Sequence, residues 1–366
     1  MANAIVHKNA RMCNRKREIP VPQGAEFRGP LADYLARFAF RLMTMTACRE
    51  EYRENGYFIP FSSVHGRQLL GGNWDKVKKA SVNHPVFEWN DRYSNFSGNS
   101  FCKSVRLRKE FRTGHAVLYE FRRKRSTPEF DPGNLDTIAR KLFDKLYEFH
   151  LPDTPPMFEN PWQAYTWERV YHKDHFGHRC QWNRFHTLIT SFKHRDMLLH
   201  DYGKVVAVDI RACQPLILGM VVRNHYGMTT DLEDYFGKYR EGLYEFFAEK
   251  MKVSRKAAKK ALIVCIFHTL EGMRNMPIFQ VFLEYFPTIA TYLVCAKQVN
   301  HEQVATNCQR LESRLLVDRV TSLLPDVPLA TVHDEFITLE QHQQRVRDTI
   351  LSVFREQDVT PEIAGR

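Results

Sequence analysis

The chain has 366 residues and a formal net charge of +11, with 43% hydrophobic and 26% charged residues. This composition is ordinary for a folded protein of two or three domains. The longest apolar stretches, such as residues 261–267, are too short to cross a bilayer, and no apolar secretory segment follows the basic N-terminal residues. We therefore expect a cytoplasmic protein with no membrane partner. Eight cysteines without a CxxC pair argue against a disulfide framework and a structural zinc site.

The positive charge is concentrated in the first part of the chain. Residues 1–150 contain 27 Lys and Arg against 16 Asp and Glu, whereas residues 151–366 contain 26 of each class. A basic segment joined to a neutral one indicates a module that binds polyanions, attached to a second functional unit. Residues 1–30 mix basic residues with Pro and Gly and show no periodicity, so we expect a flexible basic arm there.

After the arm, the sequence predicts helices followed by a small β-hairpin. Apolar residues recur at helical spacing over Leu31–Tyr52, and a second helix is predicted over Asp75–Ser81. Short extended segments follow at Val86–Trp89 and Val105–Leu107. This order resembles a winged-helix module, and the segment Ser100–Leu107 resembles the wing of replication-initiator domains.

Basic and aromatic residues are interleaved near the end of this predicted domain, which spans residues 31–150. A solvated charged surface would account for such a run, but the aromatic residues and the uneven charge favour a nucleic-acid interface. The candidate nucleic-acid-binding residues are Arg106, Arg108, Arg122, Arg123, Lys124 and Arg125. An amphipathic helix over Leu135–Phe149 and the prolines at 152, 155, 156 and 161 mark the predicted boundary with a second domain, residues 151–366.

Two β-type segments of the second domain carry carboxylates at their ends. Val205–Asp209 is a run of strand-forming residues, and Leu329–Leu339 alternates like the two strands of a hairpin, with His-Asp-Glu at the bend, residues 333–335. If these strands are neighbours in one antiparallel sheet, Asp209 and Asp334 meet. A carboxylate at a strand end is more often a helix cap or a turn residue, so either one alone is weak evidence for catalysis.

A third element lies between these segments. Ser254 is a good N-cap, and the helix predicted after it places Arg255, Lys259, Ile263 and Phe267 on one stripe, four residues apart. A core helix with basic residues at a solvated end would have this pattern. The same stripe would also bind a triphosphate, with phosphates on the two cations and the base or sugar against the aromatic ring.

Taken together and in this order, the three elements resemble motifs A, B and C of the family A DNA polymerases. Asp209 with Gln214 five positions later corresponds to motif A, Arg-x3-Lys-x7-Phe beginning at Arg255 to motif B, and Val-His-Asp-Glu at 332–335 to motif C. The single-subunit RNA polymerases of phages and mitochondria share much of this pattern. The match covers roughly residues 180–340, about half of the chain.

The resemblance implies an α+β fold of the right-hand polymerase type. An antiparallel palm sheet would take residues 160–225 and 300–366, and helical fingers would take residues 226–300. It also implies template-directed nucleotidyl transfer, in which a monomer on a DNA primer-template adds dNTPs to the primer 3′-hydroxyl without a proofreading exonuclease. Such enzymes serve DNA replication, and a phage or mobile element is one setting for this one.

The resemblance further assigns roles to individual residues. Two Mg²⁺ ions, which Mn²⁺ can replace, would be held by Asp209, Asp334 and the backbone carbonyl of Ile210, with Glu335 as a further candidate ligand. The residues expected to contact the incoming nucleotide are Arg255, Lys259, Phe267 and Gln214. Lys259 would also offset the charge that develops on the leaving pyrophosphate. His333 and Arg184 would contact the primer or template backbone.

Some positions depart from the family pattern. Glu usually stands where this chain has Gln214, and Tyr or Phe followed by Gly where it has Phe267 and His268. Two alternatives therefore stay open: an RNA polymerase or primase on the same palm, and a non-enzymatic winged-helix replication initiator with a decayed palm. A decayed palm should have lost a carboxylate or the Arg-Lys pair, and all four residues are present. Bulky Gln214 favours dNTPs over rNTPs by steric exclusion.

Overall fold

The computed structural model describes residues 18–48, 50–54, 56–61, 63–90, 103–112, 115–120, 137–172, 178–179, 185–186, 192 and 194–365. The chain forms two compact units. Unit 1 consists of residues 1–134, 149–176 and 189–199. Unit 2 consists of residues 135–148, 177–188 and 200–366. The chain therefore passes between the units several times, whereas the sequence analysis placed one boundary at the proline cluster.

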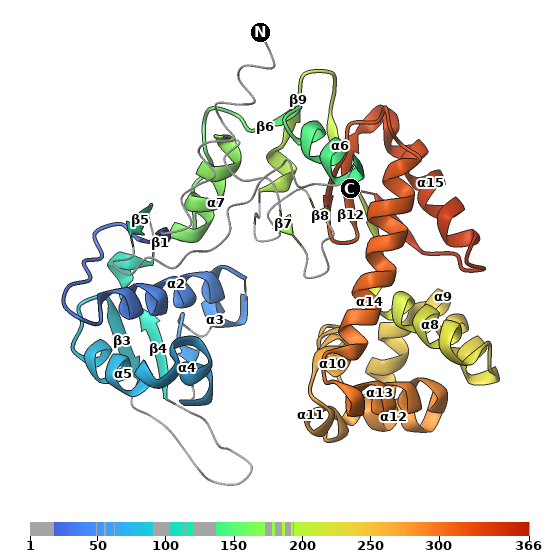
Figure 1. The fold of residues 1–366 in the computed structure, drawn as a ribbon, viewed down its shortest axis with the longest axis horizontal. Helices are drawn as coiled ribbons and strands as arrows, with labels where there is room; N and C mark the ends of the chain where they lie inside the picture. The colour runs from blue at the N-terminus through green and yellow to red at the C-terminus, as the bar shows by residue number, and fades with distance from the viewer. Residues whose placement is uncertain are drawn as a thin grey trace. The chain divides into compact units, whose positions relative to one another are not determined.

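Unit 1 contains helices and small β-sheets (Figure 1). Its helices are α2 (Ala32–Cys48), α3 (Glu50–Glu54), α4 (Ser63–Leu70), α5 (Trp74–Val82) and α7 (Pro161–Tyr171), with 3₁₀ turns η2 (Gly71–Asn73), η3 (Lys109–Phe111) and η5 (Arg195–Met197). Its strands are β1 (Glu18–Pro22), β2 (Ile59–Pro60), β3 (Phe87–Asn90), β4 (Ser104–Leu107) and β5 (Ala116–Glu120). Strand β6 (Phe149–His150) pairs with β9 (Leu199–His200).

The expectation of a flexible arm through residue 30 is wrong for its second half. Strand β1 pairs with β5 in antiparallel register, and Val21 and Phe27 are buried. Such pairing depends on a strand about 100 residues away, which local periodicity does not show. Pro20 and Pro22 are tolerated because β1 has a partner on one side only in its two-stranded sheet.

The helices and hairpin predicted for residues 31–107 are present. From α2 to β4 the order is two helices, one strand, two helices and two strands, and the strands form a sheet of order β2-β4-β3. Strands β3 and β4 pair from Phe87 opposite Leu107 to Asn90 opposite Ser104. An aromatic core that includes Phe38 and Trp74 lies beneath this sheet. Residues 91–102 between β3 and β4, including the start of the wing-like segment Ser100–Leu107, lie outside the described part.

Unit 2 combines one four-stranded antiparallel sheet with many helices. Its helices are α6 (Thr137–Leu146), α8 (Cys213–Tyr226), α9 (Thr230–Met251), α10 (Arg255–Phe267), α11 (Leu270–Arg274), α12 (Pro277–Tyr285), α13 (Pro287–Val299), α14 (Gln303–Ser313) and α15 (Gln343–Arg355), with a π-helical segment η6 (Arg314–Val320) and a 3₁₀ turn η7 (Glu340–His342). Its strands are β7 (His178–Arg179), β8 (Phe185–His186), β10 (Val205–Ile210), β11 (Ala330–Val332), β12 (Glu335–Leu339) and β13 (Ile363–Gly365).

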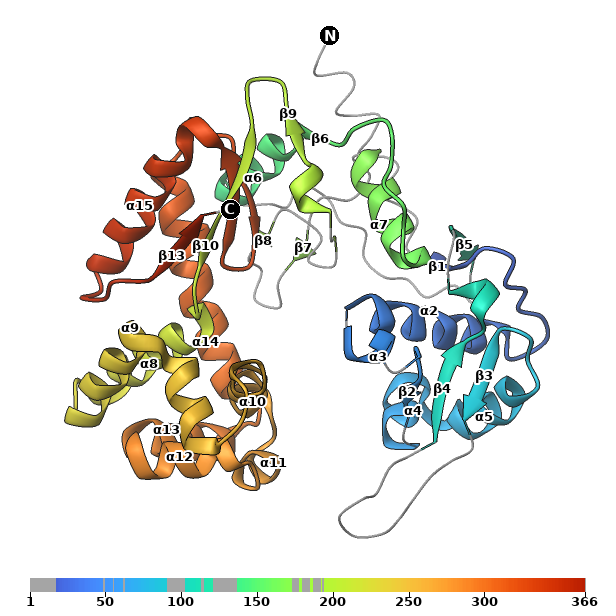
Figure 2. The ribbon, with the colours of Figure 1, turned by 180° about the vertical axis from the view of Figure 1, so that it is seen from behind.

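The four-stranded sheet has the order β11-β12-β10-β13 (Figure 2). Alternate residues of β10, namely Val206, Val208 and Ile210, are buried, so Asp209 lies on the opposite face of the strand. Strands β11 and β12 form the predicted hairpin, and β10 pairs with β12 as the sequence analysis expected. Helix α15 packs against β10 and β12.

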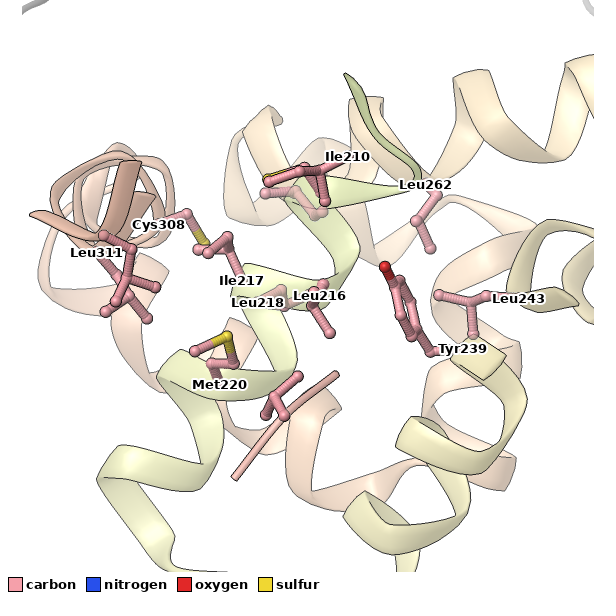
Figure 3. Packing of buried hydrophobic residues seen from close by; sticks show 14 of the residues in the cluster. Ile210, Leu216, Ile217, Leu218, Met220, Tyr239, Leu243, Leu262, Cys308 and Leu311 are labelled. Atoms are coloured by element: carbon pink, nitrogen blue, oxygen red, sulfur yellow. The ribbon is translucent and has the colours of Figure 1, made fainter. Parts of the chain in front are cut away.

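Helix α8 connects this sheet to the helices α9–α13, which we call the helical subregion. The helix follows β10 directly, and most of its residues from Cys213 to Val222 are buried. Figure 3 shows Cys308 and Leu311 of α14 on one side of α8, and Tyr239 and Leu243 of α9 on the other. A helix that is apolar nearly all round is the expected centre of a core. Within the described part of the chain, none of the helices has the length and apolarity that a membrane crossing requires.

Helix α9 contains a kink at Gly242, whose φ is 122° and ψ 77°. An alanine there would adopt a strained backbone, and its Cβ would lie 2.9 Å from Glu245 Oε2. Gly242→Ala should therefore lower the free energy of unfolding by about 1–3 kcal/mol. Gly237 of the same helix has no atom within 4 Å of such a Cβ. Gly237→Ala should instead raise stability by about 0.5–1 kcal/mol. Urea unfolding of both variants tests this, and the same sign for both would contradict it.

Candidate active site

The pairing of β10 with β12 brings the predicted carboxylates together. Asp209 lies opposite Glu335 in the register, so these two side chains occupy the same face of the sheet. Asp334 directly precedes β12 in the turn after His333, whose φ is 54°, and its backbone carbonyl accepts a hydrogen bond from Ile210 N at 3.4 Å. The structure therefore places Asp209, Asp334 and Glu335 at one end of the sheet.

The electrostatic environment of Asp334 reflects this proximity. Burial and then the negative charge of Asp209 raise the pKa of Asp334 from 3.8 to about 6. Glu335 adds to this rise, whereas Lys259 of α10 opposes it. The ends of β10, β12 and α10 are thus close enough for their charges to interact, which is the arrangement that the three sequence motifs require.

Helix α10 begins as predicted. The Ser254 side chain accepts a hydrogen bond from Ala257 N, which is the geometry of an N-cap. The guanidinium of Arg255 lies 5.4 Å and the ammonium of Lys259 5.8 Å from the ring centroid of Tyr244, so both cations lie over the same aromatic ring. Arg255 also forms an ion pair with Glu245.

Tyr244 is a residue that the sequence analysis missed. It is buried, and burial followed by the charge of Asp334 raises the pKa of its hydroxyl to about 12. Tyr244 thus interacts electrostatically with Asp334 while its ring supports Arg255 and Lys259. Its position just after the kink at Gly242 is the reason that no helical periodicity signals it.

The aromatic end of the α10 stripe is anchored from another helix. Phe267 is the last residue of α10, and its side chain is 40% exposed. Lys297 of α13 is buried, and its ammonium donates to the carbonyls of Ile266 at 2.7 Å and His268 at 2.6 Å. A cation at a helix C-terminus satisfies carbonyls that lack partners within the helix. The main chain on both sides of Phe267 is therefore fixed.

Gln214 lies in the first turn of α8, and its amide Nε2 donates to Glu312 Oε2 of α14 at 2.8 Å. Glu312 is only 4% exposed, and burial followed by the charge of Asp334 raises its pKa to about 7. The sequence analysis missed Glu312. A signal was available, because Glu312 follows buried Cys308 by four residues and precedes buried Leu315 by three, which puts a carboxylate on an apolar helix face.

The segment after Asp209 is held by the C-terminal strand and by α9. Arg211 N donates to the carbonyl of Glu362 at 2.8 Å, and the two side chains form an ion pair. The hydroxyl of Tyr239 donates to the carbonyl of Arg211 at 2.8 Å and accepts from Glu362 N at 3.2 Å. These contacts fix the main chain around Ile210, whose carbonyl is the third predicted metal ligand.

The donor set at this end of the sheet can be compared with the needs of a divalent metal. In the described part of the chain, no group of three or more His, Cys, Asp or Glu side chains is arranged to hold a metal ion. Magnesium in nucleotide-dependent sites usually takes one or two carboxylates, and waters and substrate phosphates complete its shell. Asp209 and Asp334 fit this smaller set, because two interacting carboxylates leave a negative charge for a cation to neutralise.

The structure describes some of the predicted nucleic-acid-binding residues, and these differ in their partners and exposure. Arg106 forms a bidentate pair with Glu88, at 2.7 and 2.9 Å, and also donates to the carbonyl of Gly56, so the structure uses it within unit 1. Arg108 is exposed and donates to the carbonyl of Phe87, and His333 is exposed. Five other predicted nucleic-acid contacts lie outside the described residues: Arg122, Arg123, Lys124, Arg125 and Arg184.

Comparison with known proteins gives little beyond this geometry. No protein-family model and no curated protein matches the sequence. Among solved structures, the chain is similar to the POL domain of Pol1 from M. smegmatis in complex with DNA primer-template and dNTP, with 13% sequence identity and a TM-score of 0.38. The match covers 50% of this chain and 45% of that chain, so this chain spans less than half of that structure's length. A likeness at this level identifies neither a family nor an activity.

The raised pKa of Asp334 predicts a pH-dependent effect of Asp209→Asn on stability. The folded state binds the Asp334 proton more tightly than the unfolded state, so ionisation destabilises the fold as pH rises from about 4 through about 6. Removing the Asp209 charge should recover on the order of 1 kcal/mol of unfolding free energy at pH 7.5 and little at pH 4.

This prediction is measured by urea unfolding in EDTA at both pH values. Glu284→Gln is the matched control, because Glu284 is exposed on α12 and should show no such pH dependence. An equal change for Asp209→Asn at pH 4 and pH 7.5 would contradict the coupling of the two carboxylates.

Proposed function

We propose that the protein catalyses template-directed nucleotidyl transfer, as a DNA polymerase that adds dNTPs to the 3′-hydroxyl of a DNA primer-template. The observation that carries this proposal is the meeting of Asp209 and Asp334 at the end of one antiparallel sheet, with Lys259 of a cation-bearing helix close enough to lower the pKa of Asp334. In these terms, the four-stranded sheet is the palm and the helical subregion is the fingers.

The residues of the site divide the chemistry between them. Mg²⁺ bound by Asp209 and Asp334 would promote ionisation of the primer hydroxyl and neutralise charge on the phosphates. Arg255 would bind the outer phosphate of the triphosphate, and Lys259 would stabilise the negative charge that grows on the leaving pyrophosphate. Tyr244 holds both cations over its ring, so that they are oriented before the nucleotide arrives.

The sugar and base of the nucleotide would lie between α8 and the end of α10, which pack against each other. Gln214 would lie beside the 2′ position of the sugar, and the exposed ring of Phe267 would contact the sugar or base. Because Gln is nearly as large as Glu, it would exclude a 2′-hydroxyl by steric contact. This placement favours dNTPs over rNTPs.

Unit 1 is proposed to bind the nucleic-acid backbone. Apart from the short helix α3, the order of elements from α2 to β4 resembles that of a winged-helix module, in agreement with the interpretation from the sequence. Helix α5 buries Trp74 and Val77 and exposes the side chains of Lys76 and Lys79. Two lysines on the exposed face of a helix are suited to phosphate contacts, whereas the Arg106 guanidinium already has a partner in Glu88.

Primer extension tests the proposed reaction. The wild-type protein should extend a DNA primer on a DNA template with dNTPs in Mg²⁺, and should stop in EDTA. Asp209→Asn and Asp334→Asn should each lower the rate at least 100-fold, because each removes charge that balances the metal, while affinity for primer-template stays nearly unchanged. Gel assays of extension and fluorescence anisotropy of labelled DNA measure these two quantities.

Glu340→Gln is the matched control for the carboxylate variants. Glu340 follows the other end of β12, is exposed and pairs with Lys204, so its loss should not affect extension. Residual activity above about one hundredth in either Asp variant would remove that residue from the metal site. A wild-type preference for rNTPs would favour the RNA polymerase or primase alternative, and DNA binding without synthesis would favour the initiator.

The backbone-binding role of unit 1 predicts the salt dependence of DNA affinity. Replacing Lys76 and Lys79 together by Gln should lower the slope of log affinity against log salt concentration by nearly two on duplex DNA, because each lost phosphate contact contributes about 0.9. Anisotropy titrations at several NaCl concentrations measure the slope. Lys204→Gln serves as control, since that lysine pairs with Glu340. An unchanged slope in the double variant would place the DNA elsewhere.

A further inference from the structure

The pair formed by Gln214 and Glu312 differs from an ordinary surface hydrogen bond. Gln214 is half-buried, and Glu312 is almost entirely removed from solvent. Their single mutual contact, Gln214 Nε2 to Glu312 Oε2 at 2.8 Å, joins the first turn of α8 to the last turn of α14. A buried carboxylate is costly, so a side chain of this kind needs a reason beyond stability.

The remaining polar atoms of the pair are unsatisfied. Within the described part of the chain, the other oxygens of both side chains, Gln214 Oε1 and Glu312 Oε1, are buried without a hydrogen-bond partner, as is Ser313 Oγ next to them. A buried polar atom without a partner destabilises the fold relative to a satisfied one. The π-helical segment η6 begins at the next residue, and breaks of this kind in a helix are frequent at functional sites.

The pair also lies beside the proposed active site. The charge of Asp334 acts on Glu312, and buried Cys213, the neighbour of Gln214, is affected by the charges of Asp334 and Glu312. Helix α10, which ends at Phe267, packs against both α8 and α14. The contact between Gln214 and Glu312 is thus made where α8 and α14 adjoin the proposed sugar-binding region.

We propose that Glu312 is a positioning residue that fixes Gln214, and that this contact sets the selectivity of the enzyme for the sugar of the incoming nucleotide. The inference rests on the proposed function and deepens it. A Gln side chain has three rotatable bonds, so holding it in one orientation without a partner costs rotamer entropy. With its amide bound to Glu312, Gln214 cannot turn away from a 2′-hydroxyl.

The hydrogen bond to Glu312 explains why a Gln side chain is suited to position 214. A Glu at position 214 would place a second carboxylate against Glu312, with no hydrogen between the two oxygens unless one of them took up a proton. The amide of Gln supplies the N–H that the buried carboxylate accepts. Exchanging the two residues, as Q214E combined with E312Q, would restore one donor and one acceptor in reversed order.

The test measures the ratio of kcat/KM for dNTP to that for rNTP opposite the same template base. Glu312→Ala should lower this ratio about tenfold or more, toward the value of Gln214→Ala, and the double Ala variant should show no further loss, because both changes remove the same contact. Glu312→Gln keeps an acceptor for the amide and should retain most of the selectivity. Q214E combined with E312Q should retain most of the selectivity, because it restores one donor and one acceptor.

Controls separate this inference from the proposed function. Thermal unfolding establishes that each variant is folded, and Glu302→Gln, an exposed residue just before α14, should leave the ratio unchanged. The role of Glu312 would be overturned by a selectivity ratio for Glu312→Ala within about twofold of wild type. It would also be overturned if the losses of the two single Ala variants multiplied in the double variant. In either case, primer extension by the wild type would still support the proposed function. Absence of any extension by the wild type would overturn both.

Discussion

Pairing of β10 with β12 joins segments that lie far apart in the sequence, and it forces two carboxylates to share one partly buried end of a sheet. The negative charge of Asp209 raises the pKa of Asp334, and repulsion between the two carboxylates opposes folding. Such an arrangement is stable only if neighbouring elements hold the strands in place and if positively charged groups lie nearby. Other elements of unit 2 meet these two requirements.

The strands are held by contacts at several points. Strand β13 pairs with β10 on the side away from β12, and Tyr239 of α9 bonds to the main chain of both Arg211 and Glu362. The opposite charge comes from the first turns of α10, where Tyr244 lies beneath two cations. These contacts join the end of β10 to β13 and α9, and α9 to α10, so the site depends on segments from distant parts of the sequence.

The sequence was sufficient for those features that depend on local pattern. The strand ending near Asp209, the hairpin after Leu329 and the capped helix beginning at Arg255 were predicted because periodicity and capping residues are local signals. The role of β1 was not predictable, since its strand forms only through distant pairing with β5. Tyr244 was missed for a related reason, because a kink with a positive φ interrupts the helical period on which such predictions depend.

The anchoring of α10 by Lys297 has a consequence for motion. The ammonium binds the carbonyls on either side of Phe267, so the end of α10 cannot shift without breaking two charge-assisted hydrogen bonds or carrying α13 along. A closing movement over a bound nucleotide would therefore displace α10 and α13 as one rigid body. The hinge has to lie outside this pair, and the glycine kink in α9, next to Tyr244 and the ion pair with Arg255, is suited to absorb the change in backbone angles.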